Sequence, residues 1–309
     1  MIGRPVEVYP DDVFLVSYPK SGNTWIRFLV GNLMRRGKPV TFADIDRMSP
    51  GIYRNSQKTL RSIPRPRVIK SHECFDPRYR RVIYILRDPR DVVISLYHFE
   101  RKKGHLPDSV AIETFTQSFV NSPQEDYGTW KSHVLSWLAN PENIACFSRL
   151  TRDTAVGSNF REPEWSGVSG ALGHGRALLL LRYEDLLSNT AREMTKIAGF
   201  LGLKVTPEEI ARAVELSSAD KLKKLEAAQA HVWSATKETR KDIPFIRVAK
   251  AQQWMKALPA SCIADIEGAW GPLMQALGYK LSTQSPGNSA EPQFALQQER
   301  AWASGDGGI

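Results

Sequence analysis

The chain has 309 residues, 42% of them hydrophobic, and a formal net charge of +9. This length and composition are typical of a globular protein with one large core, and we expect a single domain. The longest apolar runs, such as Ala177–Leu181, are far too short to cross a membrane. The three cysteines, Cys74, Cys146 and Cys262, are widely spaced and include no C-x-x-C pair, which argues against a zinc or redox site and predicts a reduced, cytoplasmic protein. The positive charge suits a polyanionic ligand, but it suits nucleic acid or a membrane surface equally well.

The first informative segment is Val13–Trp25, which reads VFLVSYPKSGNTW. Its apolar run predicts a strand over Val13–Ser17, followed by a glycine-containing loop and directly by a helix. A helix start has unpaired backbone N–H groups and a partial positive charge, so such a loop can surround a phosphate or sulfate group. The candidate ligands of an anionic nucleotide here are Lys20, Ser21, Gly22, Asn23, Thr24 and Trp25. The alternative is a plain strand-turn-helix whose lysine faces solvent.

The position of Lys20 distinguishes this loop from the loop of ordinary ATP and GTP hydrolases. The Walker pattern is G-x-x-x-x-G-K-[ST], in which the lysine follows the second glycine. In this chain Lys20 precedes Gly22. The order therefore argues against a hydrolase of that kind.

A further apolar stretch ends in Val68–His72, which reads VIKSH, and predicts a strand over Val68–Lys70. Residues two apart in a strand share a face, so Lys70 and His72 should point the same way at its carboxyl end. A lone histidine is more often a packing or surface residue than a catalyst. The remaining histidines are expected to be structural or surface residues: His98, His105, His133, His174 and His231.

The second long motif is Arg81–Arg101, RVIYILRDPRDVVISLYHFER. It predicts a buried parallel strand over Val82–Leu86, with Arg87 at the carboxyl end, where open α/β sheets bind ligands. A helix should begin directly afterwards, because Asp88 is a good N-cap and the next residue is proline. Ser95 in its second turn leans back toward the N-terminus, so Arg87 and Ser95 could hold one anion. Alternatively, Arg87 pairs only with a neighbouring aspartate of the same helix start.

Taken together, SYPKSGNTW and YILRDPRDVVISLYHF resemble the cytosolic-type sulfotransferase family, which uses 3′-phosphoadenosine 5′-phosphosulfate (PAPS); the chain is similar to a bacterial-looking member with an unknown acceptor. The resemblance implies that the first loop holds the 5′-phosphosulfate and that Arg87 and Ser95 hold the 3′-phosphate. It also implies that Lys20 contacts the bridging oxygen and that Trp25 stacks on the adenine.

The family also has K-[ST]-H where this chain has KSH, and its histidine is the general base, which here would be His72. Sulfuryl transfer requires donor and acceptor to be held in line and the charge on the leaving oxygen to be neutralised. Lys20 and Lys70 would neutralise that charge, and no metal is required.

Three later segments continue the resemblance. A helix is expected over Thr129–Ala139, and the overlapping segment Tyr127–Trp137 is similar to the family's Y-G-[ST]-W helix near the acceptor pocket. The strand expected over Leu178–Leu181 precedes Tyr183, which matches the tyrosine of the family's Y-E-D motif and is a candidate donor-binding residue. A crossover helix over Asn189–Leu201 should follow.

The segment FIRVAKAQQW, residues 245–254, departs from the family pattern F-[VI]-R-K-G-x-x-G-x-W, which closes over the 3′-phosphate. Arg247 keeps the register of the family arginine. Val248, Ala249 and Gln252 replace the lysine and the two glycines, which could weaken donor binding because the freedom of glycine at positive φ is lost. We expect Arg247 at the phosphate, with Arg240 and Lys241 as the alternative.

These observations predict an α/β fold, a P-loop-like three-layer α/β/α domain over residues 1–281 with a central, mostly parallel sheet. Its last helix is expected over Pro259–Leu277. Residues 140–176 form a long insertion that is either a lid over the acceptor or a segment without function. Residues 282–309 have the composition of a disordered tail.

We therefore expect a PAPS-dependent sulfotransferase with a small-molecule, lipid, glycan or peptide natural-product acceptor that offers a hydroxyl group or an amine. No nucleic-acid partner and no membrane span are expected, and the oligomeric state cannot be read. The alternatives are a P-loop small-molecule kinase, a non-catalytic nucleotide-binding module and a nucleic-acid-binding protein.

Overall fold

The computed structural model of the chain describes residues 5–36, 38–53, 55–123, 127–140, 176–247 and 250–282. Most of the expected insertion, residues 141–175, and the expected tail from residue 283 onward lie outside these ranges. Within them, Ser282 was expected to begin the tail but donates hydrogen bonds to Glu267 through its N–H and its hydroxyl group. The folded domain therefore extends at least to Ser282.

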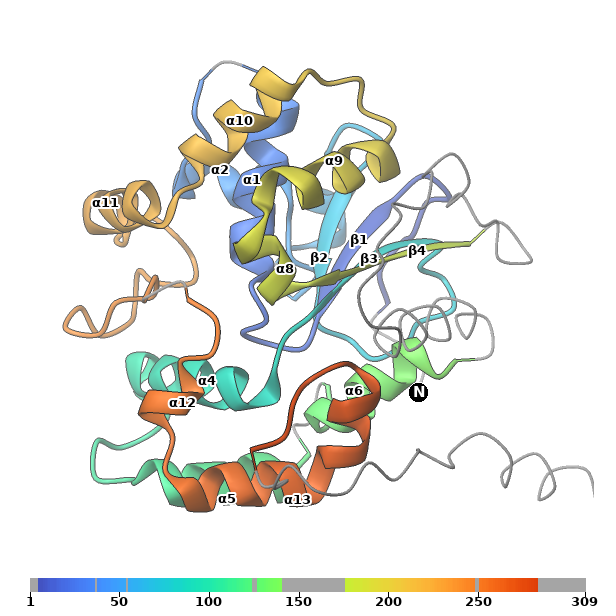
Figure 1. Cartoon of the computed structure of the whole chain (residues 1–309). Helices are drawn as coiled ribbons and strands as arrows, with labels where there is room; N and C mark the ends of the chain where they lie inside the picture. The colour runs from blue at the N-terminus through green and yellow to red at the C-terminus, as the bar shows by residue number, and fades with distance from the viewer. Residues whose placement is uncertain are drawn as a thin grey trace, which may run out of the picture.

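Four parallel strands form the central sheet in the order β2-β1-β3-β4 (Figure 1). They are β1 (Val13–Ser17), β2 (Val68–Ser71), β3 (Arg81–Leu86) and β4 (Ala177–Arg182). All four predicted strands are confirmed to within one residue at each end. Val13 lies opposite both Val68 and Arg81, so the carboxyl ends of β1, β2 and β3 meet at one edge of the sheet.

Helices cover both faces of this sheet, which confirms the predicted three-layer α/β/α architecture (Figure 1). One layer contains α1 (Asn23–Arg35), α8 (Tyr183–Ser188), α9 (Thr190–Leu201) and α10 (Pro207–Leu216). The other contains α4 (Pro89–Lys103), α5 (Ile112–Asn121), α6 (Trp130–Leu138), α12 (Trp254–Ala257) and α13 (Ala260–Ala276). Shorter or peripheral helices are α2 (Phe42–Met48), α3 (Gln57–Arg61) and α11 (Ala219–Gln229).

The alternation of side chains along the strands produces two separate cores. From β1, Val13 and Leu15 pack with the α1, α9 and α10 layer, whereas Phe14 and Val16 pack with the layer that holds α4, α6 and α13. A third, smaller cluster joins α2 and α11 through residues such as Phe42 and Leu222. The sheet is thus buried on both sides, as its nearly continuous apolar strands indicate.

Helix boundaries follow signals that are visible in the residues. The Asp88 side chain accepts a hydrogen bond from the N–H of Arg90 and Pro89 is the first residue of α4, as predicted. The helices expected around α6, α9 and α13 are present, whereas α2, α3, α5, α8, α10, α11 and α12 were not anticipated. No helix in the described part of the chain is long and apolar enough to span a membrane.

Candidate active site

A cavity of about 690 Å³ lies at the carboxyl ends of β1, β2 and β3, where an open parallel sheet presents its loops. It brings together residues from segments as distant as the β1–α1 loop and residues 245–247. The predicted site residues that line it are Lys20, Gly22, Asn23, Thr24, Trp25, Lys70, His72, Arg87, Ser95, Tyr183 and Arg247. Of the predicted set only Ser21 is absent from the lining; its hydroxyl group is buried and has no hydrogen-bond partner among the described residues.

The β1–α1 loop turns sharply through two residues with positive φ, Lys20 at 67° and Gly22 at 100°. A Cβ atom at Gly22 would lie 2.5 Å from the Cδ2 atom of Tyr183, so glycine is required both by the backbone angle and by this close approach. Gly22 is the N-cap of α1 and no side chain caps the helix. The unpaired N–H groups of the first turn and the positive end of the helix dipole are therefore available to an anion in the cavity.

The Lys20 ammonium group lies between two aromatic rings. Its Nζ atom is 4.0 Å from the centroid of the Phe99 ring and 4.3 Å from that of the Phe245 ring. Burial, with smaller contributions from the positive charges of Arg87 and Lys70, lowers the pKa of Lys20 to about 7. Because an anion nearby favours the charged form, a bound phosphate or sulfate would raise that pKa again.

Arg87 connects the two sequence motifs. It is 6% exposed, its Nη1 donates to the Lys20 carbonyl oxygen at 2.9 Å, and its guanidinium stacks 4.3 Å above the Tyr183 ring. Its Nε atom is buried without a hydrogen-bond partner among the described residues, and Ser95 and Arg247 line the same cavity. A buried donor without a partner beside other cations is a suitable place for an oxyanion.

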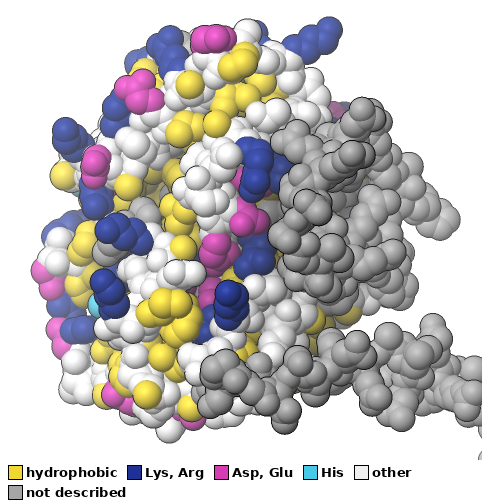
Figure 2. Space-filling model, viewed as in Figure 1, with side chains coloured by type: hydrophobic (Ala, Val, Ile, Leu, Met, Phe, Trp, Pro, Cys, Tyr) yellow, Lys and Arg dark blue, Asp and Glu magenta, His cyan; other side chains and the backbone are white. Residues whose placement is uncertain are grey.

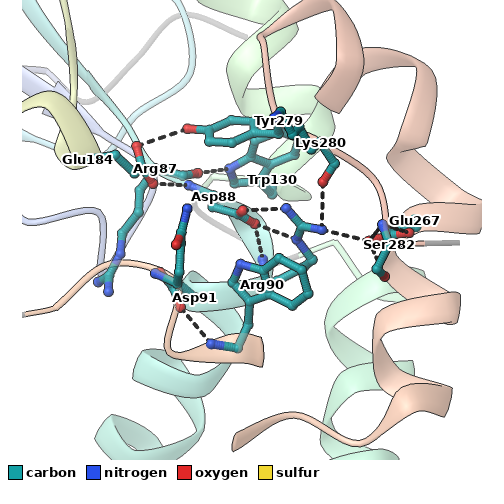
Figure 3. Close-up of polar contacts among 12 residues, drawn as sticks. Arg87, Asp88, Arg90, Asp91, Trp130, Glu184, Glu267, Tyr279, Lys280 and Ser282 are labelled. Atoms are coloured by element: carbon teal, nitrogen blue, oxygen red, sulfur yellow. Dashed lines mark hydrogen bonds and ion pairs between the residues drawn. The ribbon is translucent and has the colours of Figure 1, made fainter. Parts of the chain in front are cut away.

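The turn that carries Arg87 is held by a buried network of hydrogen bonds and ion pairs (Figure 3). Arg90 makes ion pairs with Asp88 and Glu267, both at 2.6 Å, so Asp88 is engaged by Arg90 rather than by Arg87. The Glu184 carboxylate accepts hydrogen bonds from the Asp88 N–H and, at 3.3 Å, from the Tyr279 hydroxyl group. These contacts leave the Arg87 guanidinium directed away from the network, as Figure 3 shows.

Asp91, the second aspartate at the start of α4, binds backbone groups of a distant segment instead of pairing with Arg87. Its two carboxylate oxygens accept hydrogen bonds from the backbone N–H groups of Gln252 and Trp254, at 2.8 and 3.0 Å. Gln252 has φ of 59°, so a side chain occupies the left-handed region where the family pattern has glycine. Val248 and Ala249, the other replaced positions, lie outside the described residues.

Trp25 and Asn23 are held by hydrogen bonds on opposite sides of α1. The Trp25 indole N–H donates to the Ser217 carbonyl oxygen at 2.9 Å, and its ring meets the Tyr183 ring edge-on with the centroids 5.9 Å apart. The Asn23 amide donates to the carbonyl oxygen of Leu15 at 3.0 Å, so this predicted ligand mainly braces the loop against β1. Trp25 therefore presents a fixed ring to the cavity.

His72 has one ring nitrogen fixed by a backbone carbonyl group. Its Nδ1 atom lies 2.7 Å from the carbonyl oxygen of Ser17. A carbonyl oxygen only accepts hydrogen bonds, so Nδ1 carries the proton and Nε2 keeps its lone pair. Burial, followed by the positive charge of Lys70, lowers the pKa of His72 well below its usual value, although the bond to Ser17 acts in the opposite direction. The imidazole is therefore neutral at pH 7.

Two supporting residues around His72 were not singled out from the sequence. His133 is completely buried; its Nε2 donates to the His72 carbonyl oxygen at 3.1 Å, and its Nδ1 accepts from the Tyr84 hydroxyl group at 2.9 Å. Tyr53 accepts the His72 N–H at 2.9 Å. His133 could have been noticed, because it lies three residues after Trp130 and so shares the buried face of α6.

The two candidates for the C-terminal phosphate ligand lie in different places. Arg247 lines the cavity that Arg87 also lines, and burial is the main cause that lowers its pKa. Arg240 makes ion pairs with Asp108 and Asp242, both at 2.6 Å. The Lys241 ammonium donates to two backbone carbonyl groups, and neither Arg240 nor Lys241 lines the cavity. The geometry therefore favours Arg247.

Comparisons with known proteins identify the family. A family model described as "Sulfotransferase domain" matches residues 10–278. Sulfotransferase 1A1 of Mus musculus is 26% identical over 293 residues, which cover 89% of each chain. Sulfotransferase 1E1 of Bos taurus is 24% identical over 263 residues, covering 80% of this chain and 78% of that protein.

Solved structures are similar over most of the chain. Mouse sulfotransferase SULT7A1 complexed with PAP superimposes with a TM-score of 0.62 and 23% identity, covering 87% of this chain and 86% of the other. A retinol dehydratase in complex with retinol and PAP gives a TM-score of 0.60 with 19% identity, covering 91% and 85%. These structures establish the fold, and the family match establishes the class: the chain belongs to the sulfotransferase family and is a sulfotransferase, as its two motifs predicted.

Proposed function

We propose that this sulfotransferase moves the sulfuryl group of PAPS to a hydroxyl group, or to an amine, of its acceptor by in-line transfer. The observation that carries the proposal is that His72, Lys20 and Arg87 line one cavity. PAPS supplies an activated sulfuryl group whose departure leaves negative charge on the bridging oxygen. No metal is needed for that step.

The residues around the acceptor handle a proton. His72 Nε2 takes the proton of the attacking hydroxyl group, while the bond between Nδ1 and the Ser17 carbonyl keeps the ring in the required tautomer. As the imidazole becomes charged, that same bond stabilises it. Lys70, which belongs to β2, lines the same cavity and adds positive charge toward the sulfuryl group.

The residues around the donor bind and orient anions. The first N–H groups of α1 and Lys20 face the 5′-phosphosulfate, and Lys20 stabilises the leaving oxygen. The unpartnered Nε of Arg87, together with Ser95 and Arg247, suits the 3′-phosphate. Trp25 and Tyr183 offer rings to the adenosine. Two structural relatives are complexes with PAP, 3′-phosphoadenosine 5′-phosphate, which supports a donor of this kind.

The acceptor is proposed only as a class. Related structures are complexes with retinol or androsterone, which supports a small molecule with an alcohol group. Lipid, glycan and peptide natural-product acceptors stay within the proposal, because the acceptor side of the cavity is lined by scattered residues such as Tyr53 and Tyr127. The cytoplasmic location stays a prediction.

Two alternatives receive less support. A kinase on this scaffold needs the Walker order, which the Lys20-before-Gly22 loop lacks. A nucleic-acid-binding protein needs clustered cations with exposed aromatic rings. In Figure 2 acidic side chains are interspersed among the Lys and Arg side chains, and the exposed large apolar residues in the described part of the chain, Met34, Val232 and Met255, are not aromatic.

One experiment separates these functions. Calorimetric titrations are run separately with PAP, with ATP plus magnesium and with a short nucleic-acid duplex. Only PAP should bind tightly. Incubation with sulfur-labelled PAPS and panels of alcohols, phenols, amines, lipids and glycans should then label one class. Preference for ATP over PAP, or binding of the duplex alone, would overturn the proposal.

A further inference from the structure

The segment between α11 and α12 contains no long helix or strand, yet it delivers two groups to the donor end of the cavity. Phe245 contributes a ring to the Lys20 ammonium group, and Arg247 lines the cavity. Side chains on an irregular segment are held in place by contacts from outside it, and residues 243–247 have such contacts.

A single carboxylate holds two consecutive residues of this segment. Glu226 in α11 accepts hydrogen bonds from the backbone N–H of Phe245 at 2.6 Å and from that of Ile246 at 2.8 Å. The Lys102 ammonium at the end of α4 donates to the carbonyl oxygens of Arg240 at 2.9 Å and Ile243 at 2.6 Å. The Lys102 Nζ and Glu226 Oε1 atoms are themselves 3.8 Å apart. One ion pair therefore binds both the N–H groups and the carbonyl groups of the same backbone segment.

The burial of this pair indicates a specific role. The Lys102 side chain is 2% exposed and that of Glu226 is 10% exposed. Two charges removed from water are costly unless hydrogen bonds satisfy their remaining donors and acceptors. Here those hydrogen bonds go to residues 240–246, so the ion pair is stable only while this segment lies where it does.

Neither Glu226 nor Lys102 lines the donor cavity, so any influence on the reaction must pass through the segment. The Phe245 ring packs edge-on against Phe99, with the centroids 5.8 Å apart, and both rings contact the Lys20 ammonium. A shift of the Phe245 backbone therefore moves one wall of the Lys20 pocket. Arg247, two residues later, moves with it.

We propose that Glu226, paired with Lys102, is a positioning residue: through Phe245 it sets the position of the Lys20 ammonium, and through the same backbone it holds Arg247 in the donor site. The inference rests on the proposed role of Lys20 as the group that stabilises the leaving oxygen. Glu226 itself touches neither donor nor acceptor.

The principal variant is Glu226→Gln, because a glutamine has the same shape but can accept only through one oxygen and leaves Lys102 without a counter-charge. We expect PAP affinity and kcat each to fall about tenfold. Glu226→Asp keeps the charge but withdraws the carboxylate by one methylene, and it should reproduce the loss if the Gln variant does not fold. Glu215→Gln is the matched control, since Glu215 is exposed and pairs with Lys221 at the surface; its values should equal those of the wild type.

The discriminating measurement is a double-mutant cycle with Phe245→Leu, read on kcat. If Glu226 acts through Phe245, the double variant should lose little more than either single variant. Additive losses, or a wild-type kcat and PAP affinity in both Glu226 variants, would overturn the proposal. Failure of the proposed function would give a different result. Either Lys20→Ala would have the kcat of the wild type, or the wild type would not bind PAP, and both results are independent of the Glu226 variants.

Discussion

The proposed donor end and the proposed acceptor end of the cavity are built in different ways. The donor end consists largely of backbone amides and of side chains from two contiguous motifs, residues 13–25 and 81–101, which the parallel pairing of β1 with β3 brings together. The acceptor end consists of single residues, His72, Tyr53 and Tyr127, from three separate segments. The proposed donor end is thus concentrated in two long motifs, whereas the proposed acceptor end takes single residues from segments far apart in the chain.

The largest effect should come from the acceptor end. We expect His72→Asn to lower kcat for an aliphatic alcohol by about 10²–10⁴-fold, because the general base is lost, while PAP affinity is unchanged. An acidic phenol, already partly ionised, should lose less. The lowered pKa of His72 places the falling limb of the pH–rate profile on the acid side of an ordinary histidine. Equal losses for both acceptors would assign the base elsewhere.

Lys20→Ala tests the donor end at the atom where charge develops. The kcat of this variant should fall by about 10²-fold or more, because the lost ammonium group acts mainly on the leaving oxygen. The affinity for PAP should fall much less. Steady-state kinetics and calorimetry measure the two quantities separately. A normal kcat would remove Lys20 from the mechanism.

Arg87→Ala should sharpen the distinction within the donor itself. Loss of the charged hydrogen bonds to the 3′-phosphate should weaken the interaction with PAPS by about 1.5–3 kcal/mol. The preference for PAPS over adenosine 5′-phosphosulfate should therefore fall roughly ten- to a hundredfold. The ratio of kcat/KM for the two donors measures it. An unchanged ratio would contradict the assignment.

The smallest predicted effect is a pH dependence of donor binding. Lys20 has a pKa of about 7 in the free protein, and an anion raises it, so PAP binding takes up a proton above that pH. Affinity should therefore decline between pH 7 and 9, by less than tenfold per pH unit. His72 is neutral throughout this range and adds nothing. In Lys20→Ala the curve should be flat, and a decline that persists there would point to another group.

How far the sequence alone could be interpreted depends on whether a feature is encoded in consecutive residues. The strands, the β1–α1 loop and the start of α4 were predictable because each signal lies within a few consecutive residues. Helix α10 was readable but overlooked: Thr206 and Glu209 form a capping box around Pro207. In contrast, no local pattern indicates that Glu226 binds the backbone of Phe245, because that contact depends on the path of an irregular segment.

The network around Arg90 has a consequence for where this protein can be divided. The family match stops at residue 278, but Arg90 donates to the carbonyl oxygen of Lys280, and Ser282 donates to the same Glu267 that pairs with Arg90 (Figure 3). A chimaera joined to a relative at residue 278 would thus mix foreign residues into the support of the Arg87 turn. A junction placed after Ser282 would transfer the donor end as an intact module.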